Sequence, residues 1–337
     1  MKLIKYALLL IAVIYLLAVL IPRSYPVPQQ QERKGTLHWN LSTGSDIAYT
    51  LIQGKGERRK TPIIYLQGGP GGFISERNIK LFEPLSDDGF DVYLYDQIGS
   101  GQSSRLSDVT EYTADRHKRD LEEIISKIGS EKVILVGQSW GTILATMFIA
   151  DHPGKVEKAV FVGPGPIQPI RNELLDVIAP DSLDLIKPVF SNREANEKLN
   201  NIRTNAMAFC ARHFGIRLAS DREADDFQTY VNNGLNKSAV CDTSKALKAE
   251  GGGGYYVQVM TVESFARIQD PRPRLKNSAI PVLLMKGQCD NQPWGFMIEY
   301  LALFPHHELK IIPGAGHSVS IEQPALYEHT IREFLSH

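Results

Sequence analysis

Five residues, Gly137-Gln138-Ser139-Trp140-Gly141, constrain the fold of this chain more than any other feature. They follow Lys132–Val136, a β-branched run typical of a buried strand, and precede Thr142–Ala150, an apolar helix start. Between a strand and a helix, glycine-x-serine-x-glycine predicts a sharp turn that exposes the serine hydroxyl beside the helix N-terminus. Glycines are needed there because neighbouring backbone passes too close for a Cβ atom. We interpret Ser139 as a candidate nucleophile, with a purely structural turn as the alternative.

Strand-like and helix-like segments alternate on both sides of this turn. Thr36–Asn40 and Ile47–Ile52 predict an opening hairpin. Thr113–Ile128 predicts a helix, with Thr113 as its N-cap and Gly129 as its stop. The expected buried strands are Pro62–Leu66, Asp91–Tyr95, Lys132–Val136, Ala159–Val162, Pro281–Met285 and Leu309–Ile312. This repetition predicts an α/β fold, with a mostly parallel central sheet and helices on both faces.

The segment 167–274 interrupts the alternation. It is rich in charge, is helix-like and lacks buried strand runs. Because it lies between core segments 36–166 and 275–337, we expect an inserted helical cap over the carboxyl ends of the strands, where such sheets bind ligands. Within it, Gly251–Gly254 predicts a flexible loop.

The N-terminus has a different character from the rest of the chain. Lys2 and Lys5 precede the apolar stretch Tyr6–Ile21, and no convincing small-x-small cleavage site follows it. We therefore expect an uncleaved signal-anchor, a transmembrane helix, over residues 1–22, with a cleaved signal peptide and a secreted protein as the alternative. The lysines place the N-terminus in the cytoplasm and the remaining chain outside, in the periplasm or the extracellular space. Residues 23–35 predict a polar tether.

Composition bears on partners and cofactors. The net charge is −1, which argues against a nucleic-acid partner. The sequence shows neither a cluster with metal-ligand spacing nor a phosphate-binding G-x-x-x-x-G-K-[ST] motif. We therefore expect chemistry that requires no metal and no cofactor.

The three cysteines leave two arrangements open. Cys210 and Cys241 lie in one region and could form a disulfide in an oxidising compartment, which would leave Cys289 unpaired. Free buried thiols are the alternative.

A serine nucleophile needs a base and an orienting acid. His317 lies in Pro313–Ser318, a small-residue loop directly after the last expected strand. Asp290 follows the strand before it, and the order Ser139, Asp290, His317 is one that serine hydrolases use. The alternatives are a structural histidine and a turn-capping or helix-capping aspartate. Asp96 also follows a strand but precedes the serine, so we interpret it as a structural acid that ties down its glycine-rich loop.

The developing oxyanion needs preorganised N–H donors, each of which contributes about 3 kcal/mol in typical cases. The N–H of Trp140, next to the serine, is one candidate. The other is the N–H of Gly68 or Gly69, in the loop Gln67–Gly72 that follows the first buried strand. Simple turn chemistry is the alternative, but four glycines and a proline in six residues exceed what a turn requires.

Several motifs together resemble those of the proline iminopeptidase family of α/β-hydrolases. They are Gln67-Gly68-Gly69-Pro70-Gly71, Asp96-Gln97-Ile98-Gly99-Ser100-Gly101-Gln102-Ser103, Gly137-Gln138-Ser139-Trp140-Gly141, Gly287-Gln288-Cys289-Asp290 and Gly314-Ala315-Gly316-His317. The resemblance covers about residues 36–337, apart from most of the cap. It implies an α/β-hydrolase fold and release of an N-terminal residue, often proline, from peptides.

The chain departs from this family at two places. Gln67 stands where the family usually has histidine, which changes the polar support of the glycine loop but leaves its backbone donors. The usual tryptophan- and glutamate-containing cap segment of proline-specific members is missing. Val257–Glu263 instead resembles an apolar-x-Cys-x-Glu segment of the tripeptidyl-aminopeptidase branch, with Thr261 at the cysteine position. That resemblance implies Glu263 as the carboxylate that binds a substrate amine; a solvated helix glutamate is the alternative.

Three functions fit these observations. The first is an aminopeptidase with a Ser-His-Asp acyl-enzyme mechanism, and the second is an esterase, lipase or other small-acyl hydrolase with the same triad. The third is a binding module on a hydrolase fold that has no catalytic activity, which a complete triad disfavours. The expected partners are therefore a small peptide or acyl substrate and, through the N-terminal helix, a membrane.

Overall fold

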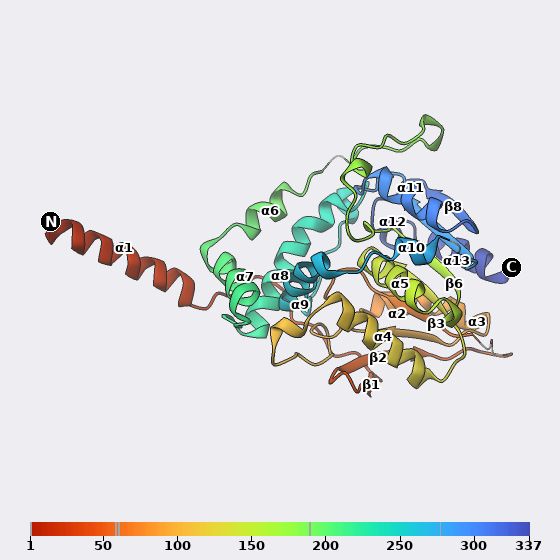
Figure 1. Ribbon diagram of the computed structural model, residues 1–337, viewed down its shortest axis with the longest axis horizontal. Helices are drawn as coiled ribbons and strands as arrows, with labels where there is room; N and C mark the ends of the chain where they lie inside the picture. Colours follow the sequence, from red (N-terminus) through yellow and green to blue (C-terminus); the bar gives the residue numbers. More distant parts are fainter. Residues whose placement is uncertain (1, 58, 60, 189, 277) are drawn as a thin grey trace.

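A mixed β-sheet forms the centre of the protein in the computed structural model (Figure 1). The structure describes residues 2–57, 59, 61–188, 190–276 and 278–337, so Met1 of the expected anchor lies outside the described residues. Within them the sheet has eight strands, in the order β1-β2-β4-β3-β5-β6-β7-β8. The strands are β1 Leu37–Asn40, β2 Asp46–Ile52, β3 Ile63–Leu66, β4 Val92–Tyr95, β5 Val133–Gln138, β6 Val156–Val162, β7 Val282–Gly287 and β8 His307–Ile312. β2 pairs antiparallel with β1 and β4, and all other neighbours are parallel, which confirms the predicted fold class.

Both faces of the sheet are covered by helices. In β3, Ile64 and Leu66 join one buried cluster, whereas Ile63 and Tyr65 join another, because successive side chains point to opposite faces. The first cluster includes residues of α4 Ala114–Ile128, α5 Trp140–Asp151 and α11 Trp294–Leu303. The second includes residues of α2 Glu76–Phe82, α3 Pro84–Asp87, α12 Val319–Glu322 and α13 Pro324–Ser336. Burial on both faces explains why the strands are continuous apolar runs.

The expected helix boundaries are confirmed in α4. The Thr113 side chain accepts a hydrogen bond from the Arg116 N–H at 3.0 Å, as an N-cap does. Gly129 ends the helix at a φ of 75°, which glycine adopts without strain. The strands β6 and β8 begin earlier than expected, since Glu157 and Glu308 near their starts carry no apolar signal.

The segment 167–274, which we call the cap, contains several helices and no strand among its described residues. Its helices are α6 Arg193–Leu199, α7 Ile202–Phe214, α8 Asp221–Leu235 and α9 Tyr255–Glu263, and α10 Arg272–Leu275 crosses its end. The cap contacts the loops that follow β3, β7 and β8, because Gly254, Asn291 and Ser318 each form a hydrogen bond between cap and core. It therefore covers the carboxyl ends of the strands.

Gly251–Gly254 forms a loop, as predicted, but this loop is packed inside the protein. All four glycines are buried. The Gly254 N–H donates to Gly71 O at 3.1 Å, and the Gly101 N–H donates to Gly252 O at 2.8 Å. A Cβ at Gly254 would lie 2.2 Å from Gly99 O, so the run allows backbone to pack on backbone.

The N-terminal helix α1, Lys2–Leu20, is exposed over Leu3–Leu17 and projects from the cap side of the protein (Figure 1). By length and composition it can cross a membrane, which is consistent with an anchor or a signal sequence. The following segment lies along the cap. Tyr25 packs against Phe227 and Tyr230, with ring centroids 5.2 and 5.7 Å apart, and Pro28 O accepts a hydrogen bond from the cap.

The cysteines follow neither arrangement proposed from the sequence. Cys241 and Cys289 form a disulfide, with Cα atoms 5.4 Å apart, whereas Cys210 on α7 is a free thiol. The proposed Cys210–Cys241 bridge is therefore wrong. The pairing depends on tertiary contact, because the cap segment around Cys241 passes over the loop that follows β7. Distance along the sequence does not reveal such a contact.

Candidate active site

Ser139 lies on a strained turn between β5 and α5. Its φ of 51° and ψ of −115° lie in a region that residues other than glycine rarely adopt. The Ser139 N–H donates to Val162 O at 3.0 Å, which holds the turn on β6. A Cβ at Gly141 would lie 1.9 Å from Leu66 O, so the second glycine of the motif is required. Ser139 is half-buried.

Asp290 and His317 are brought together by the loops after β7 and β8. His317 Nδ1 lies 3.0 Å from Asp290 Oδ1, and the side chains are 14% and 0% exposed. An Nδ1–H donated to a buried carboxylate fixes the tautomer and leaves Nε2 free to accept a proton. The Gln292 N–H also donates to Asp290 Oδ1, at 3.0 Å.

Lys286, near the end of β7, forms a polar contact with Asp290 that the sequence did not predict. Its ammonium lies 3.2 Å from Asp290 Oδ2 and donates to Gln292 O at 2.9 Å. Burial by itself raises the pKa of Asp290, but His317, Lys286 and the Gln292 N–H together lower it to about 2. Asp290 is therefore ionised near neutral pH. A lysine four residues before the acid, in a strand buried at every position, was the available signal.

Two contacts hold the serine turn and the histidine loop at the same edge of the sheet. Gln138 Nε2 donates to His317 O at 3.1 Å. A Cβ at Gly163, the residue after β6, would lie 2.9 Å from His317 Nδ1, so the imidazole packs directly on this glycine. The ends of β5 and β6 thereby hold the loop of His317 beside the turn that carries Ser139.

The glycine loop after β3 passes against the serine. A Cβ at Gly68 would lie 3.4 Å from Ser139 Cβ. Trp140 is the first residue of α5, so its N–H has no partner inside the helix. Gly69 adopts a φ of 130°, which requires a glycine. The structure thus places Gly68 against Ser139. Trp140 follows Ser139 directly, and the role of Gly69 as a donor stays a prediction.

Gln97 joins the glycine loop to Trp140. Its Oε1 accepts from the Gly71 N–H at 3.0 Å and from the Trp140 indole N–H at 3.1 Å. Its Nε2 donates to Gln67 O at 2.8 Å and to Gly68 O at 3.1 Å. The Gln97 side-chain amide therefore bonds to four polar groups and fixes the glycine loop against the indole of Trp140. These bonds are a physical reason for a glutamine at position 97 and a tryptophan at position 140.

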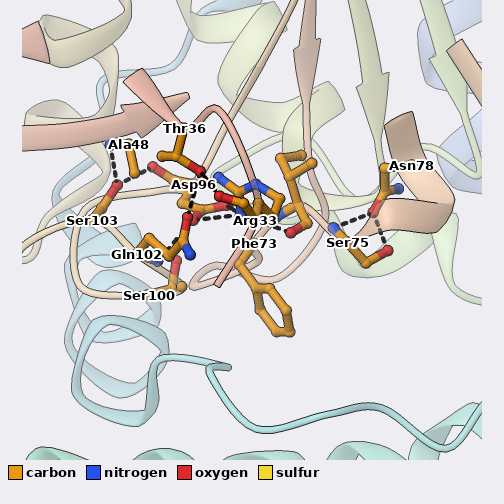
Figure 2. Close-up of polar contacts among 12 residues, drawn as sticks. Arg33, Thr36, Ala48, Phe73, Ser75, Asn78, Asp96, Ser100, Gln102 and Ser103 are labelled. Carbon is orange, nitrogen blue, oxygen red and sulfur yellow. Dashed lines mark hydrogen bonds and ion pairs between the residues drawn. The ribbon is translucent and has the colours of Figure 1, made fainter. Parts of the chain in front are cut away.

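Asp96 bonds to the backbone of two neighbouring loops (Figure 2). Its buried carboxylate accepts from the Ile74 N–H and the Gln102 N–H, both at 2.7 Å. This confirms its predicted role as a structural acid. The sequence did not indicate its partner, Arg33, whose Nη1 lies 2.9 Å from the carboxylate. The segment before β1 therefore contributes to the site.

A family model described as the alpha/beta hydrolase fold matches residues 61–324. The chain belongs to the α/β-hydrolase family. The proline iminopeptidase of Heyndrickxia coagulans is 26% identical over 302 residues, which cover 87% of this chain and 96% of that protein.

Two solved structures share the hydrolase fold. An esterase from Exiguobacterium antarcticum has a TM-score of 0.61 at 14% identity, covering 89% of this chain and 99% of its own. The proline iminopeptidase of Mycobacterium smegmatis has a TM-score of 0.57 at 18% identity, covering 90% of this chain and 98% of its own. At these identities the likeness shows the fold alone.

Glu263 lies apart from the contacts that surround Ser139, Asp290 and His317. Its side chain is exposed and pairs with Arg212 Nε at 3.3 Å on the cap surface. Thr261, two residues earlier, is buried and contacts His117 Nε2 at 3.2 Å. Positions i and i+2 lie on nearly opposite sides of a helix, so burial of Thr261 turns Glu263 outward. The contacts of the described residues do not bring Glu263 to Ser139, and its role in amine binding stays a prediction.

The described part of the chain contains no group of three or more His, Cys, Asp or Glu that could hold a metal ion.

Proposed function

We propose that this α/β hydrolase is a serine hydrolase in which Ser139, His317 and Asp290 form the catalytic triad. The observation that carries the proposal is the 3.0 Å contact from His317 Nδ1 to the buried Asp290, on a loop bonded to the strained serine turn. His317 Nε2 takes the hydroxyl proton of Ser139 as the oxygen attacks the acyl carbon. Asp290 orients the imidazole and stabilises the imidazolium.

The remaining steps use backbone donors and the same histidine. The N–H groups of Trp140 and of Gly69 or Gly68 stabilise the negative oxygen of the tetrahedral intermediate. His317 then donates its proton to the leaving group, and an acyl-enzyme remains on Ser139. Water, deprotonated by His317, attacks this ester and regenerates the serine. The proposed chemistry requires no cofactor.

The proposed reaction is release of N-terminal residues from peptides. Its support is the relative named proline iminopeptidase, matched over 96% of its length, and the Gln97–Trp140 bond that joins two motifs of that resemblance. One observation favours a second candidate, an esterase of small acyl groups. Glu263, the expected amine-binding carboxylate, is exposed and neutralised by Arg212.

The proposed location is outside the cytoplasm, with α1 as an uncleaved anchor and a secreted protein as the alternative. The disulfide between Cys241 and Cys289 supports this location, because such bonds persist in oxidising compartments.

Hydrolysis of three matched substrates tests the reaction. An aminoacyl-naphthylamide, its N-acetylated counterpart and a short-chain acyl ester are compared by kcat/KM. An aminopeptidase hydrolyses the first, and acetylation of the amine abolishes turnover. Turnover of the ester alone would instead establish the esterase. Labelling of folded protein by a fluorophosphonate, lost in Ser139→Ala, tests the triad independently of substrate, and absence of labelling favours a binding module without catalytic activity.

A further inference from the structure

The C-terminal end of α1 is attached directly to the cap. Arg203 of α7 is buried, donates to Val19 O in the last turn of α1 and pairs with Glu223 of α8. The Arg23 N–H donates to the same carboxylate at 2.9 Å. Only two residues separate the end of α1 from Arg23, a reach of about 10 Å when extended. If α1 crosses a bilayer, the cap must therefore lie at the bilayer surface rather than swing on a free tether.

The cap presents an apolar surface next to this junction. Ile202, Phe209, Phe214 and Ile216 are 46%, 54%, 63% and 53% exposed, and we call this surface the α7 face. Ile202 and Phe209 lie seven residues apart, on one side of the helix. The rings of Phe209 and Phe214 are 5.7 Å apart, so the exposed aromatic area is contiguous. Figure 1 shows α7 at the edge of the cap nearest α1.

We propose that the α7 face rests in the interfacial layer of the bilayer that α1 crosses, an inference that depends on the proposed role of α1 as an anchor. A bilayer is the occupant that the observations favour, because the Arg203 contact with Val19 holds α7 at the end of the helix that would span it. Aromatic and aliphatic side chains partition into that layer. Arg212, beside them, is paired with Glu263, so the attraction is apolar rather than electrostatic. The catalytic domain is then held with its cap toward the lipid.

Lipid quenching of a tryptophan reporter tests this placement in the full-length chain. Phe209→Trp is reconstituted by α1 into phosphatidylcholine vesicles, plain or brominated on the acyl chains. The native Trp39, Trp140 and Trp294 are buried and supply a constant background. The matched control is Ile178→Trp, at a position that is 88% exposed. It lies between α6 and η3 Asn172–Leu174, which contacts α11, whereas α1 contacts α7. Phe214→Trp is a second reporter on the face.

We expect brominated lipid to quench the fluorescence that the new tryptophan of Phe209→Trp adds to the native background. In plain vesicles, the emission maximum of that tryptophan should shift to shorter wavelength. Ile178→Trp emission is expected to be equal in both. Each variant must retain wild-type hydrolysis of a soluble substrate, which establishes its fold. Equal emission of both face reporters in the two kinds of vesicle overturns the proposal. Extraction of the chain by alkaline carbonate overturns the anchor itself, and the α7-face proposal with it. Neither result bears on the triad.

Discussion

In the core and in the cap of this hydrolase, different kinds of contact set the positions of the residues. In the core, each residue of the proposed triad comes from a loop at the end of a parallel strand, so its position is set by the sheet. In the cap, the key contacts join segments that are distant in sequence, such as Cys241 with Cys289 and Gly254 with Gly71. The comparison teaches that the sheet positions the chemistry, whereas tertiary contacts of the cap decide what surrounds it.

One cap segment, Ser238–Asp242, contacts the loops of both the proposed acid and the proposed base. Ala239 O accepts from the Ser318 N–H at 2.9 Å, next to the proposed base. Asn291 donates to Ser238 O at 3.0 Å, next to the proposed acid. Glu322 accepts from the N–H groups of Cys241, Asp242 and Gly316. The cap therefore holds the acid and base loops in one arrangement.

The largest effect is expected from the core. Ser139→Ala removes the proposed nucleophile, so kcat should fall on the order of 10⁶-fold, as in subtilisin. The thermal midpoint should be retained, because a half-buried hydroxyl contributes little to stability. Ser107→Ala, at an exposed serine, is the control and should leave kcat unchanged. Substantial turnover by folded Ser139→Ala would refute the assignment.

The next effect tests the junction of cap and core. The bond between Cys241 and Cys289 closes a loop of 48 residues, for which loss of the constraint costs about 4 kcal/mol in the chain-entropy model. Replacing both cysteines by serine should lower the free energy of unfolding by about that amount, measured by urea titration. It should also reduce kcat, since the acid loop loses its covalent tie. Cys210→Ser changes a free thiol and is the matched control; equal stability of the two variants contradicts the prediction.

A smaller effect concerns the charge of the proposed acid. The pKa of Asp290 is about 2 in the folded protein, below its ordinary value of 3.8. A lowered folded-state pKa contributes stability that is present above about pH 4 and is lost as the pH falls toward 2. The contribution is about 2 kcal/mol. Asp290→Asn should therefore lose less stability than the wild type between pH 5 and pH 2. Identical pH dependence of the two unfolding free energies would show that Asp290 is not held ionised.

The sequence predicted the parts of the molecule that local patterns determine. Runs of buried residues located the strands, and the positions of Asp290 and His317 after them led to the contact that the structure shows. Lys286, Gln97 and Arg33 were not predicted, because a buried polar residue is recognised by its partner, which only the fold supplies. The close packing of Gly251–Gly254 was not predicted for the same reason. A glycine run is compatible with flexibility or with close packing, and the neighbouring Gly99 decides between them.

The smallest expected effect concerns substrate recognition by the cap. Exposed ion pairs contribute less than about 1 kcal/mol, and the pair of Glu263 with Arg212 is of this kind. Glu263→Gln should therefore change KM less than about fivefold, and equally for free-amine substrates and for the short-chain acyl ester. Arg212→Gln is the matched control, because it breaks the same pair and leaves the carboxylate. If Glu263→Gln raises KM for free-amine peptides alone while Arg212→Gln does not, the carboxylate reaches the substrate amine. The cap would then have to move α9 relative to the core during binding, because burial of Thr261 against His117 holds Glu263 outward in this arrangement.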